Sequence, residues 1–289
     1  MRDTMIQIKD IVRQREFNYR RTPERRVQTP AAARAFVEEV GFCHFWPVKG
    51  VELPNLFHAI AGQARPVPFE HEDADLSLCW SWKDDSLDKK WWYYGKLLRR
   101  RATLVALSEL PYFYALSENF GALDDYLQEY AEGRITAEAK AIYEALLEHG
   151  PLDTLSLRRK ARMSAETAKS RFEKALTDLQ VGLKVLPVGV TEAGAWHYAF
   201  VYELLLRWLP EIAEQARPIR QRDARRHLLL RYLQTVVAAT AAEVTRLFGW
   251  TSEEVNEAAC ALEGAHLILG DVAIQGLQGA WLVIASALC

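Results

Sequence analysis

The chain has 289 residues, enough for about two domains, and half of them are hydrophobic. This composition excludes a disordered protein, and four cysteines without C-x-x-C spacing exclude a disulfide-stabilised fold and a zinc-finger or dithiol site. The net charge is −2, no apolar run could span a bilayer, and the N-terminus lacks the apolar core of a signal peptide. We therefore expect a cytoplasmic protein without a membrane contact, a cofactor or a metal.

The first predicted helix covers residues 30–40. Thr29 precedes Pro30, and proline is favoured at the first position of a helix because its missing N–H has no partner there anyway. Apolar residues then recur with helical spacing until Gly41, a residue typical of helix ends. The aromatic run Phe42–Trp46 follows and predicts a strand.

The segment from 47 to 95 is rich in proline, aspartate and tryptophan and has no clear periodicity, so we expect irregular structure there. Helical patterns return near Leu97 and within Phe113–Tyr130. Together these features predict an N-terminal domain over residues 1–132, a winged helix with an aromatic-rich insertion at about 47–95.

The middle of the chain predicts three helices and a hairpin. Thr136, Asp153 and Ser164 each have the side chain of a helix N-cap, and each precedes an apolar pattern of helical period. Leu183–Val190 and Trp196–Tyr202 then have the composition of two strands around a turn.

The C-terminal part repeats this order. Thr240-Ala-Ala-Glu243 and Thr251-Ser-Glu-Glu254 both fit the capping box, in which the threonine hydroxyl and the glutamate carboxylate each accept from a backbone amide. Three short apolar segments follow and predict strands at 266–269, 272–274 and 281–285.

The two sets of helix starts are spaced alike. Asp153 and Ser164 are 11 residues apart, Thr240 and Thr251 are 11 residues apart, and the second pair lies 87 residues after the first. Such a repeat indicates two copies of one structural unit. Helix, helix–turn–helix and hairpin is the order of a winged helix. We therefore predict a mainly α protein with small β-wings and tandem winged helices at 133–216 and 217–289.

Basic residues are concentrated in four runs. Seven lie from Arg158 to Lys174, six from Lys89 to Arg101 without any acid, six from Arg217 to Arg231, and eight arginines lie within the first 35 residues. Each run either contacts phosphates or forms a solvated helix face balanced by glutamates. From the first two runs we predict DNA contacts by Arg158, Arg159, Thr167, Ser170, Arg171, Lys174, Lys96, Arg99, Arg100 and Arg101.

The third helix of the C-terminal copy differs in charge. It offers Glu253, Glu254, Asn256 and Glu257, and an acidic face repels phosphate. We therefore expect this copy to be a structural or protein-facing unit rather than a second DNA reader.

Aromatic residues are dense at Trp80–Trp82 and Trp91–Tyr94, with lysines among them. Such rings either stack on unpaired bases or form the core of the insertion. The core interpretation is favoured because Trp and Tyr supply much of the buried area of a small domain. Candidate contacts with a base or a lesion are Phe45, Trp46, Trp82 and Trp91.

The chain contains no glycine-rich phosphate loop, H-E-x-x-H or G-x-S-x-G motif. Cys43 and His44 are adjacent on a predicted strand, so their side chains point to opposite faces and make a poor nucleophile–base pair. His44 alone is either a catalytic residue or a histidine with a structural role.

The tandem copies, the arginine-rich start and Val40-Gly41-Phe42 before a strand resemble the YcaQ/AlkZ family of tandem winged-helix proteins. Its characterised members are DNA glycosylases that remove bulky alkylated or crosslinked bases. Four segments look like the AlkZ-related subgroup: Trp80-Ser-Trp-Lys-Asp, Tyr94-Gly-Lys-Leu-Leu-Arg, Leu110-Pro-Tyr-Phe-Tyr-Ala-Leu and Val236-Val-Ala-Ala-Thr. The resemblance covers most of the chain and implies a role in DNA repair.

The resemblance ends at the catalytic motif. The family carries Q-φ-D or Q-φ-Q after an L-G-φ-φ stretch, φ being apolar. Aligning Val40-Gly41-Phe42-Cys43 with that stretch puts His44-Phe45-Trp46 on the motif. In the family the two polar groups position the water and stabilise the cationic sugar, and Trp46 does neither. The resemblance thus implies a partner, double-stranded DNA, and an excision activity that is altered or lost, with His44 as the remaining catalytic candidate.

Two other functions stay open. A winged-helix transcriptional regulator would read a defined sequence, usually as a dimer, whereas this chain has no dimerisation coiled coil and we expect a monomer. A protein-interaction module without nucleic-acid binding would fit the acidic helix of the C-terminal copy and the near-neutral net charge.

Overall fold

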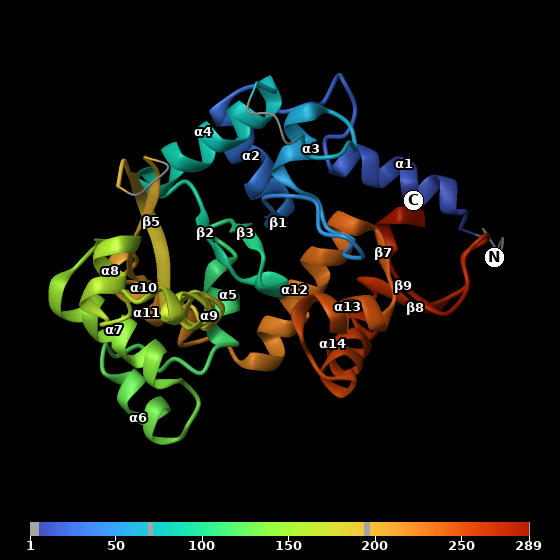
Figure 1. The fold of residues 1–289 in the computed structure, drawn as a ribbon. Helices are drawn as coiled ribbons and strands as arrows, with labels where there is room; N and C mark the ends of the chain where they lie inside the picture. The colour runs from blue at the N-terminus through green and yellow to red at the C-terminus, as the bar shows by residue number, and fades with distance from the viewer. Residues whose placement is uncertain (1–5, 69–71, 194–196, 289) are drawn as a thin grey trace.

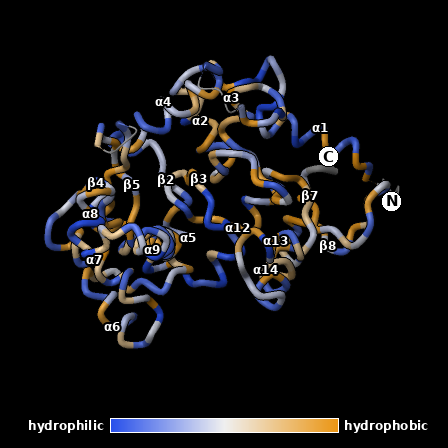
Figure 2. The backbone as a smooth tube through the Cα atoms, viewed as in Figure 1, coloured by the Kyte–Doolittle hydropathy of each residue, from blue (hydrophilic) through white to orange (hydrophobic). Residues whose placement is uncertain are grey.

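The computed structural model describes residues 6–68, 72–193 and 197–288. The chain is mainly α-helical, as predicted, and it forms three groups of helices, each with a three-stranded antiparallel sheet (Figure 1). Hydrophobic segments occur in every group (Figure 2). Of the helices in the described ranges, none combines the length and the apolar character needed to cross a membrane.

The N-terminal group has the order helix, strand, helix, helix, hairpin, and its sheet order is β1-β3-β2. Thr29 caps the first helix and Gly41 ends it, as predicted. The irregular structure expected over 47–95 and the helix expected near Leu97 are both wrong, because the first region holds two helices and the second a hairpin. The elements are α2 (Pro30–Val40), β1 (Phe42–His44), α3 (Leu56–Ala61), α4 (Ala74–Lys89), β2 (Tyr93–Lys96), η1 (Leu98–Arg100) and β3 (Ala102–Val105).

The central group repeats that order, with sheet order β4-β6-β5. Thr136 and Asp153 cap their helices as predicted. Ser164 does not, because a 3-10 turn precedes the third helix and delays its start to Lys169. The predicted strand start at Trp196 lies outside the described residues. The elements are α7 (Ala137–His149), β4 (Leu152–Asp153), α8 (Thr154–Lys160), η2 (Glu166–Ala168), α9 (Lys169–Val181), β5 (Val185–Thr191) and β6 (Ala199–Leu204).

The C-terminal group has the same order again, with sheet order β7-β9-β8. Both predicted capping boxes are confirmed, at Thr240 with Glu243 and at Thr251 with Glu254. The two strands expected between 266 and 274 form one strand. The elements are α12 (Gln221–Val236), β7 (Ala238–Ala239), α13 (Ala241–Phe248), α14 (Ser252–Gly264), β8 (Ile268–Val272) and β9 (Trp281–Ile284).

Shorter elements join the groups. α5 packs against α11 and α12, α4 packs against β5, and β2 packs against α9. The α1 residue Arg15 donates from Nε to the Val236 carbonyl at 2.8 Å and from Nη2 to the Ala238 carbonyl at 2.7 Å, which fixes α1 to the C-terminal group. The joining elements are α1 (Ile8–Asn18), α5 (Leu110–Ala115), α6 (Asp125–Ala131), α10 (Leu205–Trp208) and α11 (Ile212–Ala216), and η3 (Ala285–Leu288) follows β9.

Candidate nucleic-acid interface

The tip of the β2–β3 hairpin is basic and exposed. Lys96, Arg99, Arg100 and Arg101 all present their side chains to solvent. Arg99 and Arg100 have φ angles of 55° and 58°, a left-handed conformation that costs roughly 1–2 kcal/mol per residue when a Cβ is present. Eight other non-glycine residues of the described chain also have positive φ angles, so the charge of the tip rather than its backbone makes it a candidate site.

A cleft of about 490 Å³, which we call the basic cleft, lies between this tip and the segment after β1. Four cations line it and no acid does. Arg100 pairs with Asp178 at 2.5 Å, whereas Lys49 and Arg101 have no ion-pair partner among the described residues. Unpaired cations around a cleft favour an anionic ligand. The lining residues are Trp46, Pro47, Val48, Lys49, Lys96, Arg100, Arg101 and Ala102.

The hairpin tip lies against α9, so the two predicted basic regions meet. Lys96 Nζ donates to Thr177 Oγ1 at 3.3 Å. Arg171 and Lys174 are exposed, and their spacing puts them on the same helix face as Asp178. The exposed ion pair of Arg171 with Glu138, at 3.3 Å, is weak enough for a phosphate to replace. We call the resulting surface the basic band: Lys49, Lys96, Arg100, Arg101, Arg171 and Lys174.

Two of the other predicted DNA contacts have partners within the chain. The Arg158 guanidinium donates to the Met163, Ser164 and Ala165 carbonyls at 3.2–3.4 Å, so it holds the turn before α9. Arg159 is exposed and donates to Ser156 Oγ at 3.2 Å.

The remaining predicted contacts are exposed. Thr167 lies in η2 and Ser170 in the first turn of α9. Arg99 lines a separate pocket of about 220 Å³ together with Arg225 and Trp250. The structure therefore brings the hairpin and α9 together and leaves Arg99 outside that surface.

The other two basic runs are largely neutralised by carboxylates. Their arginines join elements that are distant in sequence, such as α1 to the loop before α3 and α12 to α14. These pairs favour the balanced-face interpretation for both runs. The pairs are Arg15–Glu52, Arg20–Glu39, Arg21–Glu16, Arg25–Glu39 and Arg26–Asp75 near the N-terminus, and Arg225–Glu254, Arg226–Asp223 and Arg231–Glu109 on α12.

His44 lies on β1 opposite Thr103 and is 1% exposed. Burial lowers its pKa to about 4; the Ala102 backbone opposes this shift, and the positive charges of Arg101 and Arg99 add to it. Neither ring nitrogen has a partner with hydrogen-bond geometry among the described residues. The imidazole is therefore neutral near pH 7 and has almost no surface that a ligand can reach.

Most of the aromatic residues at Trp80–Trp82 and Trp91–Tyr94 are buried, as the core interpretation predicts, whereas Trp80 and Trp91 are partly exposed. Trp82 is 5% exposed and Phe45 is 1% exposed. Trp46 is half-buried and lines the basic cleft, and Trp91 is half-buried with its ring centroid 5.8 Å from that of Trp92. Trp80 belongs to the aromatic segment identified from the sequence but not to the candidate contacts chosen from it; it is 37% exposed and lies next to Trp46.

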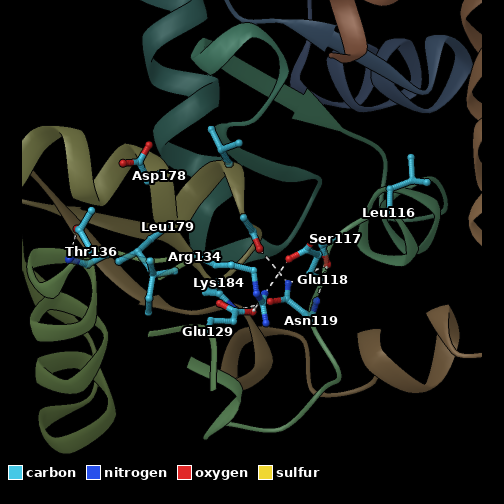
Figure 3. Close-up of a pocket in the computed structure, with 14 residues that line it drawn as sticks. Leu116, Ser117, Glu118, Asn119, Glu129, Arg134, Thr136, Asp178, Leu179 and Lys184 are labelled. Atoms are coloured by element: carbon cyan, nitrogen blue, oxygen red, sulfur yellow. Dashed lines mark hydrogen bonds and ion pairs between the residues drawn. The ribbon is translucent and has the colours of Figure 1, made fainter. Parts of the chain in front are cut away.

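A second cavity, of about 330 Å³, lies between α9 and the chain around α6 (Figure 3). Lys184 donates from Nζ to Asn119 Oδ1 at 2.5 Å and pairs with Glu129 at 2.9 Å, while Arg134 pairs with Glu118 at 2.7 Å. Each charged group that lines this cavity thus has a partner in the protein, which leaves none to recognise a ligand. Within 6–68, 72–193 and 197–288, no three His, Cys, Asp or Glu side chains are grouped to hold a metal.

Comparisons with known proteins agree with this architecture. The family model for AlkZ-related proteins matches residues 27–249. Among solved structures, the Streptomyces sahachiroi DNA glycosylase AlkZ is similar with a TM-score of 0.63 at 13% identity, over 99% of this chain and 71% of that chain. At that identity the likeness shows a shared fold alone. A comparison with curated proteins found no match.

Proposed function

Because the chain belongs to the AlkZ-related family, we propose that it binds double-stranded DNA as a repair-associated protein whose base-excision activity is altered or lost. The structural neighbour is named a DNA glycosylase, which supports the repair context. The basic band is the observation that supports DNA binding. The burial of His44 is the observation that supports an altered or lost base-excision activity.

The recurrent order of helix, strand, helix, helix and hairpin supports an assignment of three winged helices, over residues 1–132, 133–216 and 217–289. Proteins with a helix–turn–helix place the second helix of that motif in the major groove. In the central unit this helix is α9, whose exposed Arg171 and Lys174 belong to the basic band.

The basic band suits the phosphates of a duplex. Its six cations come from the loop after β1, from the hairpin and from α9, so they cover an extended surface rather than one point. Each phosphate that a cation neutralises contributes about 0.9 to the dependence of log affinity on log salt concentration. Binding through this band is therefore expected to weaken steeply with salt, even though the whole chain has a net charge of −2.

The residues at the family's motif do not suit excision. Catalysis there depends on polar groups that face the developing charge of the sugar. His44 is neutral and buried, and Trp46 packs with its ring centroid 4.3 Å from that of Phe45 and 5.6 Å from that of Phe57. Neither residue activates a water in this arrangement.

Two measurements test DNA binding and base excision separately. Fluorescence anisotropy at two salt concentrations measures binding to an intact duplex and to a duplex with an abasic-site mimic, and a single-turnover assay with an alkylated-purine duplex measures base release. We expect salt-dependent binding and no base release. Lys49→Ala with Arg101→Ala should lower the salt slope by roughly 2, because both cations are free to contact phosphates.

The outcomes separate the two claims. Absence of binding to either duplex at low salt would refute the DNA-binding claim. Base release that disappears in a folded His44→Ala protein would refute the catalytic claim and make His44 a working catalytic residue.

A further inference from the structure

Five aromatic rings surround the ammonium group of Lys83, a residue that the proposed function does not use. The side chain is completely buried at 0% exposure. Its Nζ lies 4.2 Å from the ring centroid of Trp80, and the other four rings are within 6 Å, which is the range of cation–π attraction. The further distances are 4.5 Å to Phe200, 5.1 Å to Tyr198, 5.8 Å to Tyr94 and 5.9 Å to Phe45.

A carboxylate and a hydroxyl complete this aromatic cluster. Lys83 Nζ lies 2.6 Å from Asp84 Oδ1 and 2.5 Å from the Tyr198 hydroxyl, which itself donates to Asp84 at 2.8 Å. Burial lowers the pKa of Lys83, and the hydrogen bond with Asp84 opposes that shift. The network joins α4 to the chain just before β6, so the rings that contact Lys83 are fixed in position.

Of the four partly exposed rings at this place, Trp46 and Tyr198 flank Trp80, and Phe200 packs against Tyr198. Trp80 is 37% exposed, and Trp46 and Tyr198 are half-buried. The ring centroids of Trp46 and Trp80 are 5.9 Å apart, and those of Trp80 and Tyr198 are 6.0 Å apart, with both pairs in edge-to-face geometry. We call these three residues the aromatic surface. A planar ligand can stack on one ring while a neighbouring ring contacts its edge.

The aromatic surface adjoins the basic cleft, because Trp46 belongs to both. The combination of exposed rings with Lys49, Lys96, Arg100 and Arg101 matches a ligand that has planar faces and a chain of negative charges. A peptide of apolar side chains would match the rings and leave the four cations without a function. A nucleic-acid strand with an unstacked base matches both.

Resting on the proposed function, we propose that the aromatic surface binds an unpaired, uncharged nucleobase while the basic cleft holds the phosphates that flank it. The Lys83 ammonium already lies over the inner side of Trp80, so a second cation on the outer side is disfavoured by repulsion. An uncharged purine has the large face that stacking needs and no such penalty. The site would recognise a base that has left the helix.

Binding of two duplexes that differ by one unpaired adenine tests the proposal. We expect the wild-type protein to bind the bulged duplex about ten-fold more tightly than the matched one, a preference within the range that stacking of a base on an aromatic ring provides. Trp80→Ala should remove this preference and leave the affinity for the matched duplex unchanged. Trp80→Leu keeps the apolar volume above Lys83 without an aromatic face, and it should lose the preference as well.

Phe120→Ala is the matched control, because Phe120 is an aromatic side chain with 72% exposure in the segment before α6, a helix far from α4 in Figure 1. It should keep the preference. Equal wild-type binding of both duplexes would overturn the inference and leave the proposed function intact, whereas binding of neither duplex would refute the proposed function. A bulge preference that survives in Trp80→Leu would also overturn the inference.

Discussion

α9 and α14 occupy the same position in two copies of one topology, yet they present opposite charges. Each is the third helix of its group and precedes a hairpin. α9 exposes Arg171 and Lys174, and α14 exposes Glu253 and Glu257. Two copies of the same fold therefore need not share a binding surface. The exposed side chains, rather than the position of the helix in the fold, indicate which helix contacts DNA.

One acid of α14, Glu254, is used within the protein. Glu254 forms an ion pair with Arg225 of α12 and accepts from the Thr251 amide at 2.8 Å in the capping box. Glu257 lines a small cavity of about 240 Å³ with Arg222 and other α12 residues. Glu254 therefore helps to hold α14 against α12, whereas Arg171 and Lys174 in the first half of α9 face solvent.

The largest expected effect comes from giving α9 the charge of α14. Arg171→Glu with Lys174→Glu should weaken duplex binding by more than about ten-fold in low salt and lower the salt slope by roughly 2, because two phosphate contacts become repulsive. Anisotropy titrations over several salt concentrations measure both quantities. Glu253→Ala with Glu257→Ala on α14 is the control, and it should not lower the affinity. An unchanged slope in the α9 variant would remove this helix from the interface.

A smaller effect is expected on stability from α14. Glu254→Ala removes both the capping-box carboxylate and the partner of half-buried Arg225, so the free energy of unfolding should fall by about 1–2 kcal/mol. Urea titration measures this change, with the exposed neighbour Glu253→Ala expected to stay within about 0.5 kcal/mol of the wild type. DNA affinity should be the same in both variants. Equal stability of the two variants would show that the capping-box carboxylate and the pair with Arg225 add no measurable stability.

The parts of the fold that depend on local chemistry were predictable. The capping boxes at Thr240 and Thr251 and the proline start at Pro30 fix helix ends through groups only a few residues apart. α4 was missed because its buried face includes Lys83 and Ser86, which interrupt the apolar pattern that sequence reasoning looks for. The η1 turn was missed because two arginines, not glycines, adopt its left-handed conformation.

The sequence predicts which basic residues form the candidate site, but it does not predict that they lie together in the folded chain. The basic residues of the hairpin and α9 were identified from charge alone, whereas their contact depends on tertiary packing. The aromatic cluster was invisible for the same reason, since Lys83 and Tyr198 are 115 residues apart in sequence. The pairing of N-terminal arginines with distant acids, such as Arg26 with Asp75, likewise needs the folded chain.

Photo-crosslinking from α9 and α14 tests the central claim most directly. Cys260 is an exposed native cysteine on α14, and Ser170→Cys places a cysteine at an exposed position of α9. Each position is labelled alone with a cysteine-reactive benzophenone. Both proteins carry Cys289→Ser, and the α9 probe also carries Cys260→Ser. Irradiation with a radiolabelled duplex should crosslink DNA to residue 170 and not to residue 260. Crosslinking from residue 260 with none from residue 170 would contradict the account.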